Sequence, residues 1–382
     1  MPPPRGSEES VRERWGRVRR LLAVRLDNLG DVLMTTPALA AVRRSLPGVH
    51  LSLLCSRSGA AARPHLADVD DAIVYDAPWS KGSAPRDPAA DRRLLQQLEQ
   101  RGFDAAVIFT VYTQSALPAA LMCRLAGIPL RLAHSRENPY ELLSDWVPDP
   151  EPAQGIRHEV ERQLALVAAV GLHCDDDRLR FACREADAQA LSARLAAAGI
   201  GPQEPLLVVH PGATAASRRY PAAHFGLAAE RVARDSGLRV VFTGGADEAG
   251  LVAEARSVMQ QPSLSLAGLL SLGEFAALLR RARVLLSNNS GPVHIAAALG
   301  TPVVDLYALT NPQHTPWRVP ARVLNHDVPC RNCLKSVCPQ GHNDCLRKVE
   351  PQQVADATLE LLAESGAAPA LAPLSSPPIA YA

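Results

Sequence analysis

Four polar segments of the sequence each follow a run of apolar residues and could bind or transform a charged ligand. They are DNLGD at 27–31, HPGATAASRRYP at 210–221, TGGADE at 243–248 and SNNSGPVHIAAALGTP at 287–302. They combine glycines with carboxylates, arginines and hydroxyls, which suits proton transfer and the binding of a diphosphate. The GxGxxG fingerprint of dinucleotide sites and the GxxxxGK[ST] phosphate loop are both missing from the sequence, which argues against those two classes.

The first segment contains a candidate general base, Asp31. This residue is predicted at the start of a helix, where aspartate is also a favoured capping residue, so the local sequence leaves both roles open. A helix N-terminus stabilises the carboxylate and lowers its basicity. A base at this position therefore works only if proton transfer is concerted with bond breaking. The neighbouring Gly30 would allow the backbone to approach a ligand closely.

The second and third segments carry candidate donor-binding residues. Thr214 and nearby backbone amides could donate hydrogen bonds to a diphosphate, and Arg218 or Arg219 could neutralise its charge. Because adjacent side chains usually point apart, only one of the two arginines is expected to face the site. Glu248 could accept hydrogen bonds from ribose hydroxyls, or it could simply complement the dipole of its own helix.

The fourth segment predicts an anion site at a helix N-terminus. Ser290 and Gly291 precede Pro292 at the start of the expected helix, where free backbone N–H groups and the positive helix end favour phosphate. His294 lies one turn further on and faces either the ligand or the core. Asn289 ends the preceding strand and is a candidate to bond sugar hydroxyls.

Four of the eight cysteines form a cluster near the C-terminus: Cys330, Cys333, Cys338 and Cys345. Their spacing is CxxC-x4-C-x6-C, and His342 lies among them. The CxxC pair suits a tetrahedral zinc corner, but the second pair lacks that spacing. Reduced thiols or a redox-labile pair are the favoured interpretation, and structural zinc is the alternative.

Composition predicts a globular protein of about two domains, because the chain has 382 residues, 47% of them hydrophobic. The formal charge of +1 and an aromatic content of 4% argue against a nucleic-acid-binding protein. There is no apolar run of the length needed to span a membrane, and the N-terminus lacks the apolar stretch of a signal peptide. We therefore expect a cytoplasmic protein.

Short β-rich runs alternate with helical stretches, which predicts two doubly wound α/β halves with parallel sheets and a cleft between them. Four strands are expected in each half, the last of them in TPVVDLYALT at 301–310. The expected division of the chain is a flexible arm at 1–20, a first domain at 21–170, a linker at 171–204, a second domain at 205–350, a helix at 351–365 and a disordered tail at 366–382.

With these segments in place, the chain resembles glycosyltransferase family 9, the ADP-heptose:lipopolysaccharide heptosyltransferases. The resemblance rests on RLDNLGDVLMTTPAL, HPGA…SRRYP, FTGGADE and SNNSGPVHIAAALGTPVVDLY. The terminal CxxC…CP…H…C segment looks like that of the heptosyltransferase II subgroup. The resemblance implies a GT-B fold, in which two Rossmann-like domains face each other, the first for the acceptor and the second for the donor. It also implies that the helix at 351–365 packs back on the N-terminal domain.

The activity implied is the inverting transfer of a heptose from ADP-heptose to a hydroxyl of the lipopolysaccharide inner core, without a metal or other cofactor. The partners implied are this nucleotide sugar and a lipid-linked oligosaccharide acceptor, with peripheral contact at the inner face of the plasma membrane through that acceptor. By position, Asp31 matches the family's base and Arg218 the cation at the donor diphosphate. Glu248 matches the ribose contact, and Ser290 and Gly291 match the phosphate loop. Thr214 lies in the diphosphate loop.

Two departures from the family pattern keep alternatives open. Asn289 stands where heptosyltransferases commonly have aspartate, and Tyr220 replaces the usual tryptophan. A family 9 enzyme that uses a UDP- or GDP-sugar, or another glycan acceptor, is therefore an alternative. A non-catalytic nucleotide-sugar-binding protein is another, although such a protein needs no base in the cleft. A dinucleotide oxidoreductase is suggested by the sheet architecture alone.

Overall fold

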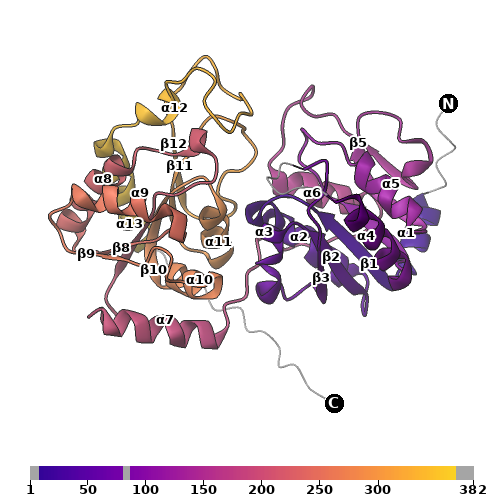
Figure 1. Cartoon of the computed structure of the whole chain (residues 1–382), viewed down its shortest axis with the longest axis horizontal. Helices are drawn as coiled ribbons and strands as arrows, with labels where there is room; N and C mark the ends of the chain where they lie inside the picture. The colour runs from indigo at the N-terminus through magenta and orange to yellow at the C-terminus, as the bar shows by residue number, and fades with distance from the viewer. Residues whose placement is uncertain (1–7, 81–86, 367–382) are drawn as a thin grey trace.

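The structure, a computed structural model, describes residues 8–80 and 87–366. Two α/β halves lie side by side, the N-terminal half in indigo to magenta and the C-terminal half in orange to yellow (Figure 1). Each half contains one six-stranded sheet in which all neighbouring strands are parallel. The predicted doubly wound α/β architecture is thus confirmed.

The first sheet has the strand order β3-β2-β1-β4-β5-β6. Its strands are β1 (Arg20–Arg25), β2 (His50–Cys55), β3 (Asp71–Val74), β4 (Ala105–Ile108), β5 (Leu130–Ser135) and β6 (Asp145–Pro148). The central strands β1 and β4 are buried almost along their whole length. This is the pattern of a parallel sheet covered on both faces, where strands are continuous apolar runs.

The helices of the first half precede, connect or follow these strands. They are α1 (Glu8–Gly16), α2 (Leu29–Ser45), α3 (Arg57–Ala60), α4 (Pro88–Arg101), α5 (Leu117–Leu125) and α6 (Glu159–Ala168). Short 3-10 turns lie at Arg63–His65 and Tyr140–Leu142. Because α2 begins only four residues after β1 ends, its N-terminus lies at the carboxyl edge of the sheet, where ligands of such folds bind.

The second sheet has the order β12-β11-β10-β7-β8-β9. Its strands are β7 (Leu206–His210), β8 (Arg239–Phe242), β9 (Ser263–Ser265), β10 (Ala282–Asn288), β11 (Val303–Leu306) and β12 (Ala321–Leu324). Its helices are α7 (Glu185–Ala197), α8 (Ala222–Ser236), α9 (Ala249–Ser257), α10 (Leu272–Arg281), α11 (Gly291–Leu299), α12 (Asp344–Arg347) and α13 (Pro351–Gly366). Further 3-10 turns lie at Ala216–Arg218 and Ala246–Glu248.

The two halves meet where α2 of the first half packs against α11 of the second. One continuous hydrophobic cluster includes Val32 and Leu33 of α2 together with Val293 and Ile295 of α11. The N-terminal ends of both helices lie at the carboxyl edges of their sheets. The packing of α2 against α11 therefore brings the polar segment at 27–31 and the polar segment at 287–302 to the same region.

The prediction of a flexible arm over 1–20 is wrong for its second part. Residues 8–16 form α1, and the side chain of Trp15 is completely buried. Its indole N–H donates to the carboxylate of Asp145 at 3.2 Å, and Val18 is also buried in the core. Val11 packs against the same hydrophobic cluster, so three apolar residues in an otherwise mostly charged stretch fix it to the core. Residues 1–7 lie outside the described residues.

The prediction that the helix at 351–365 returns to the N-terminal domain is also wrong. Helix α13 packs against α8 and near β12 in the second half. Val354, Ala355 and Leu361 are buried in the hydrophobic cluster of that half, and Asp356 forms an ion pair with Arg231 at 2.6 Å. The apolar face of α13 is therefore used up within the second half. The tail predicted beyond it, 367–382, lies outside the described residues.

Four strands were not predicted: β5, β6, β9 and β12. β5 reads LRLAHS and carries buried polar side chains, while β6 ends in Pro148. β9 has three residues, and β12 is an edge strand whose burial is only partial. Because β12 follows β11, the prediction that TPVVDLYALT holds the final strand is wrong. Within the described ranges, no helix has the length and apolar character required to cross a membrane.

Candidate active site

Asp31 lies in the first turn of α2, at the boundary between the halves. Its Oδ2 accepts a hydrogen bond from the backbone N–H of Asn28 at 3.1 Å, so the carboxylate caps the helix as part of a capping box. The capping role and the base role remain compatible, because one N–H bond leaves Oδ2 with a further lone pair. The side chain is 14% exposed, which leaves room for contact with a substrate hydroxyl.

Arg25, the last residue of β1, forms an ion pair with this carboxylate. It was not selected from the sequence. Its side chain is completely buried at the end of β1, and its guanidinium forms three ion pairs. These reach Asp31 at 3.2 Å, Asp27 at 3.1 Å and Glu159 of α6 at 2.8 Å. The available signal was a charged residue inside the apolar run LLAVRLD, since a buried arginine requires acidic partners.

Within this buried charge cluster, the pKa values of the three carboxylates are shifted in different directions. Burial alone would raise the pKa of Asp31, but the Arg25 guanidinium and the hydrogen bond from the Asn28 amide lower it below its ordinary value. Burial raises the pKa of Asp27 and of Glu159, and the negative Asp31 adds to both effects. Asp31 is therefore the member of the cluster that stays ionised most readily, as a carboxylate base must.

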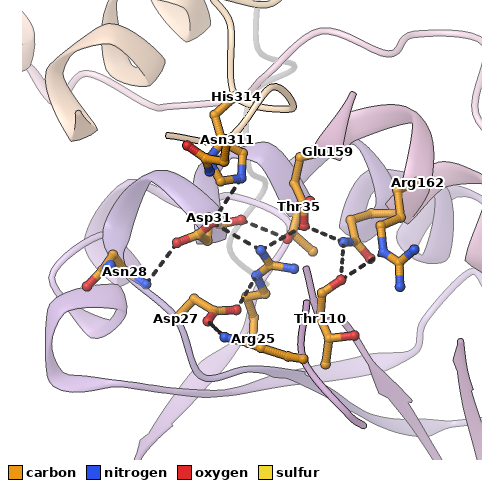
Figure 2. A network of polar contacts seen from close by, with 12 residues as sticks. Arg25, Asp27, Asn28, Asp31, Thr35, Thr110, Glu159, Arg162, Asn311 and His314 are labelled. Atoms are coloured by element: carbon orange, nitrogen blue, oxygen red, sulfur yellow. Dashed lines mark hydrogen bonds and ion pairs between the residues drawn. The ribbon is translucent and has the colours of Figure 1, made fainter. Parts of the chain in front are cut away.

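The second half approaches Asp31 through the loop after β11 (Figure 2). The Nε2 atom of His314 lies 3.8 Å from Asp31 Oδ1. On its other side, the Nδ1 atom of His314 lies 2.9 Å from the amide nitrogen of Asn311. The guanidinium of Arg218 donates to Asn311 Oδ1 at 3.4 Å. The two residues predicted to be catalytic, Asp31 and Arg218, are thus joined through two side chains across the boundary between the halves.

His294 is buried at this boundary and faces Gly30. A Cβ atom added to Gly30 would lie 2.7 Å from the imidazole Cδ2 atom, which is closer than side chains tolerate. Burial lowers the pKa of His294 to about 4, although Asp31 opposes the shift, so the ring is neutral at pH 7. Gly30 was predicted to admit a ligand; in the structure it admits the His294 ring.

Asn289 does not present its amide N–H groups to the cleft. Both are used inside the protein, on Asp305 Oδ2 at 2.9 Å and on the backbone carbonyl of His314 at 2.8 Å. The side chain is buried, so the prediction that this amide bonds sugar hydroxyls does not fit its placement. Asn289 instead anchors the loop that carries His314.

Ser290 and Gly291 begin α11 next to the first half. Ser290 is the N-cap residue, and a Cβ on Gly291 would lie 3.5 Å from Leu29 of α2. Because Pro292 occupies one of the first helical positions, the free N–H groups of this turn come from its neighbours. The predicted anion-binding helix N-terminus therefore lies beside the first turn of α2, the turn that contains Asp31.

The remaining predicted residues lie along the carboxyl edge of the second sheet. Arg219 donates from Nε to the carbonyl of Ala213 at 2.6 Å, so it is tied to its own loop while Arg218 points to Asn311. Glu248 accepts from the Gly245 N–H at 2.8 Å and lies 3.6 Å from His210 Nε2. Thr214 is exposed on the loop after β7. Among the described residues, Arg219, Glu248 and Thr214 form no hydrogen bond or ion pair with Asp31.

A cavity of about 300 Å³ opens beside Asp27 in the first half. It lies at the carboxyl ends of β1 and β4 and is lined by apolar side chains, by Thr110 and Thr113, and by the ring of Trp79. Gln114 donates to Asp27 Oδ1 at 2.6 Å at its edge. Aromatic, hydroxyl and amide groups of this kind suit a sugar ring. Sequence reasoning missed this cavity because its residues come from separate loops.

The four clustered cysteines line one small pocket together with Ser217 and His342. None of them is in a disulfide. Over 8–80 and 87–366, no group of three or more His, Cys, Asp or Glu side chains is placed to hold a metal ion. The pocket adjoins the turn of Arg218, because Ser217 Oγ donates to the carbonyl of Lys335 at 2.7 Å. The cysteine segment therefore supports the loop of the proposed donor cation.

Fold and site together define a nucleotide-sugar-dependent glycosyltransferase, and sequence comparison agrees. The profile of glycosyltransferase family 9 (heptosyltransferase) matches residues 91–343. The chain belongs to this family, and it is an enzyme of the glycosyltransferase class. Lipopolysaccharide heptosyltransferase 1 of Pseudomonas aeruginosa is 28% identical over 360 residues, which cover 88% of this chain and 96% of that protein.

Solved structures of the family have the same fold. A family 9 glycosyltransferase from Veillonella parvula aligns with a TM-score of 0.75 at 22% identity, over 91% of this chain and 97% of that one. The ADP-heptose lipopolysaccharide heptosyltransferase II of Escherichia coli aligns with a TM-score of 0.70 at 22% identity, over 91% and 100%. The predicted GT-B fold is thereby confirmed.

Proposed function

We propose that this protein transfers a heptose from ADP-heptose to a hydroxyl of the lipopolysaccharide inner core, with inversion and without a metal ion. Membership of family 9 and the names of the similar proteins support the substrates. The observation that carries the proposal is that Asp31 of one half lies 3.8 Å from His314 of the other half, which is connected through Asn311 to Arg218.

The chemistry follows from these positions. The acceptor oxygen attacks the anomeric carbon of the heptose while the bond from that carbon to the ADP oxygen breaks on the opposite face. The hydroxyl proton passes to Asp31 and the electron pair leaves with ADP. Because the pKa of Asp31 is lowered, the carboxylate is a weak base and acts in concert with bond breaking. Arg218 and the amides at the start of α11 stabilise the growing negative charge on the diphosphate.

The two halves divide the substrates between them. The cavity beside Asp27 belongs to the first half and is proposed to hold the acceptor sugar. The second half, with Arg218, Glu248, Ser290 and Gly291, is proposed to hold ADP-heptose. We propose residues 21–170 as the acceptor domain, 171–204 as the linker and 205–350 as the donor domain. A lipid-linked acceptor would be met at the inner, cytoplasmic face of the plasma membrane.

The placement of Asn289 weakens the main alternative. An asparagine in place of aspartate was the reason to consider a UDP- or GDP-sugar donor. Its amide N–H groups donate to Asp305 and to the His314 carbonyl. The replacement of aspartate by asparagine therefore alters a hydrogen bond inside the protein and not a contact with the donor. This leaves ADP-heptose as the better-supported donor.

A donor-panel assay tests the proposal. Purified protein is given ADP-heptose, UDP-sugars or GDP-sugars together with lipopolysaccharide from core-truncated cells, and the product is identified by mass spectrometry. We expect transfer from ADP-heptose that depends on acceptor and is lost in the Asp31→Asn variant. Transfer from a UDP- or GDP-sugar alone, or ADP binding with no turnover on any acceptor tried, would reject the assignment.

A further inference from the structure

A chain of polar contacts runs from Arg218 to Asp31 through the loop after β11. Figure 2 shows the side chains of its last three members, Asn311, His314 and Asp31. Arg218 donates to Asn311 Oδ1 at 3.4 Å, the Asn311 amide nitrogen lies 2.9 Å from His314 Nδ1, and His314 Nε2 lies 3.8 Å from Asp31 Oδ1. The middle two residues, Asn311 and His314, are buried and were not singled out in the sequence.

The orientation of the Asn311 amide is fixed by its surroundings. Its Oδ1 accepts from Arg218 and also from the hydroxyl of Thr310 at 3.0 Å. Two donors on one atom identify that atom as the oxygen, because an NH₂ group accepts no hydrogen bond. The amide nitrogen therefore points to His314, and it must donate to Nδ1.

This donation fixes the tautomer of His314. Burial lowers its pKa to about 3, against the opposing effect of Asp31, so the ring is neutral. A neutral imidazole whose Nδ1 accepts a hydrogen bond carries its proton on Nε2. That Nε2–H is buried and has no hydrogen-bond partner within 3.5 Å among the described residues, and the polar atom it faces is Asp31 Oδ1. Contacts between catalytic groups commonly shorten when substrate binds.

We propose that His314 is a positioning residue for Asp31 whose Nε2–H donates to Oδ1 and leaves Oδ2 to take the acceptor proton. Oδ1 then has two donors, Arg25 of the first half and His314 of the donor half. Among the residues that the structure describes, Oδ2 has only the Asn28 amide. The inference rests on the proposed function of Asp31 as the base. Through this hydrogen bond, a residue of the donor half would orient the carboxylate of the first half.

The loop that carries His314 is also held by backbone contacts that do not involve the imidazole. The backbone N–H of His314 donates to the Tyr307 hydroxyl at 3.2 Å, and its carbonyl accepts from Asn289 at 2.8 Å. Replacement of the side chain therefore leaves both backbone anchors in place. This makes variants at position 314 interpretable, because the loop keeps its attachment when the ring is changed.

Ionisable groups from every element around Asp31 contribute to its pH behaviour. Arg25 lies in β1, Glu159 in α6, His294 in α11 and His314 in the loop after β11. Asp27 lies in the loop before α2 and also interacts with Asp31. Arg218 acts on both histidines. A change in pH dependence on altering His314 must therefore be compared with a change at an unrelated histidine.

A pair of conservative variants separates a positioning role from a structural one. Glutamine places an N–H where the Nε2–H of histidine lies, whereas asparagine reaches only the Nδ1 position. We expect H314Q to keep kcat within about fivefold of wild type and H314N to lose about 10- to 100-fold, a loss typical of a misplaced catalytic group. The KM for ADP-heptose should change by less than about twofold in both.

The pH profile gives a readout that a structural role would not move. Loss of a donor destabilises the Asp31 carboxylate, so the acid limb of kcat/KM in H314N should move to higher pH. H173N, at an exposed histidine whose recorded hydrogen bonds are made by its backbone, is the matched control and should keep the wild-type profile. Equal rates in H314Q and H314N, or an unmoved acid limb, would overturn the proposal.

A measurement on the resting protein keeps the inference separate from the proposed function. Nitrogen NMR of the ¹⁵N-histidine-labelled full chain, with His314 assigned by its loss in H314Q, should show the Nε2–H tautomer near neutral pH. The N311D variant should convert the ring to an Nδ1–H or protonated form. An Nδ1–H ring in wild type overturns the inference, even if the donor panel gives transfer. The Nε2–H tautomer without any transfer would place the failure in the proposed function.

Discussion

The imidazole of His294 occupies the space where a Cβ atom on residue 30 would lie, so the two halves can pack this closely here because residue 30 is glycine. A Cβ on Gly30 would meet Cδ2 at 2.7 Å and Nε2 at 3.3 Å. Both partners are buried, and they belong to α11 and α2 respectively. Because Gly30 is adjacent to Asp31, any increase in this spacing moves the base away from the donor half.

We therefore expect Gly30→Ala to reduce turnover by about tenfold or more and to lower the free energy of unfolding by about 1–3 kcal/mol through overpacking. Thermal unfolding and initial rates measure the two effects. The double variant Gly30→Ala/His294→Ala should recover stability, because the clashing ring is gone. Gly250→Ala is the control, since a Cβ there meets open space. A Gly30→Ala enzyme as active and stable as wild type would contradict this account.

Asp31→Asn removes the base while keeping the helix cap. The amide oxygen of asparagine can still accept the Asn28 N–H, and Arg25 retains Asp27 and Glu159 as charge partners. The fold and the affinity for ADP should therefore be nearly unchanged, while kcat falls by about 10²–10⁴. Calorimetric titration with ADP measures the affinity, and initial rates with a verified acceptor measure the loss of kcat. Wild-type turnover in the variant would remove Asp31 from the mechanism.

Arg218 and Arg219 are adjacent but differ in what they contact. Arg218 reaches Asn311 beside the cleft, whereas Arg219 is bonded to the carbonyl of its own loop. We expect Arg218→Ala to weaken donor binding and to lower kcat by about 10²–10³, the usual cost of losing one stabilising donor. Arg219→Ala should have a clearly smaller effect on both. The reverse order of effects would transfer the diphosphate role to Arg219.

The sequence predicts the fold well where strands are apolar and helices have a clear period. β1, β7 and β10 are continuous apolar runs and were found, whereas β5 carries buried Arg131 and His134, and β9 has only three residues. The packing of α13 was predicted from a family resemblance and differs in this chain. Helix periodicity defines the apolar face of such a helix, but not which of two equally apolar sheets will cover it.

Candidate residues could be selected from the sequence where a polar, glycine-containing segment follows a strand. Asp31 and Arg218 were selected in this way. Arg25, Asn311 and His314 were missed because their roles depend on burial and on long-range contacts, such as the 3.8 Å approach of His314 to Asp31 from a segment nearly three hundred positions later in the chain. Local sequence likewise could not show that Asn289 would be spent on Asp305.

Asp305 gives a prediction about stability and pH. Its side chain is completely buried in β11, and burial raises its pKa from 3.8 to about 8, with the Asn289 bond opposing the shift. Between these values the folded state holds a proton that the unfolded state has lost, so the contribution of this group to stability falls as pH rises.

Asp305→Asn removes the titration and keeps an oxygen for Asn289. Its stability relative to wild type should therefore increase from pH 4 toward pH 8, by up to about 1.4 kcal/mol per pH unit. Urea unfolding at several pH values measures this slope, and the exposed Asp175→Asn serves as the flat control. A constant difference between Asp305→Asn and wild type across that range would mean that Asp305 is ionised in the folded protein.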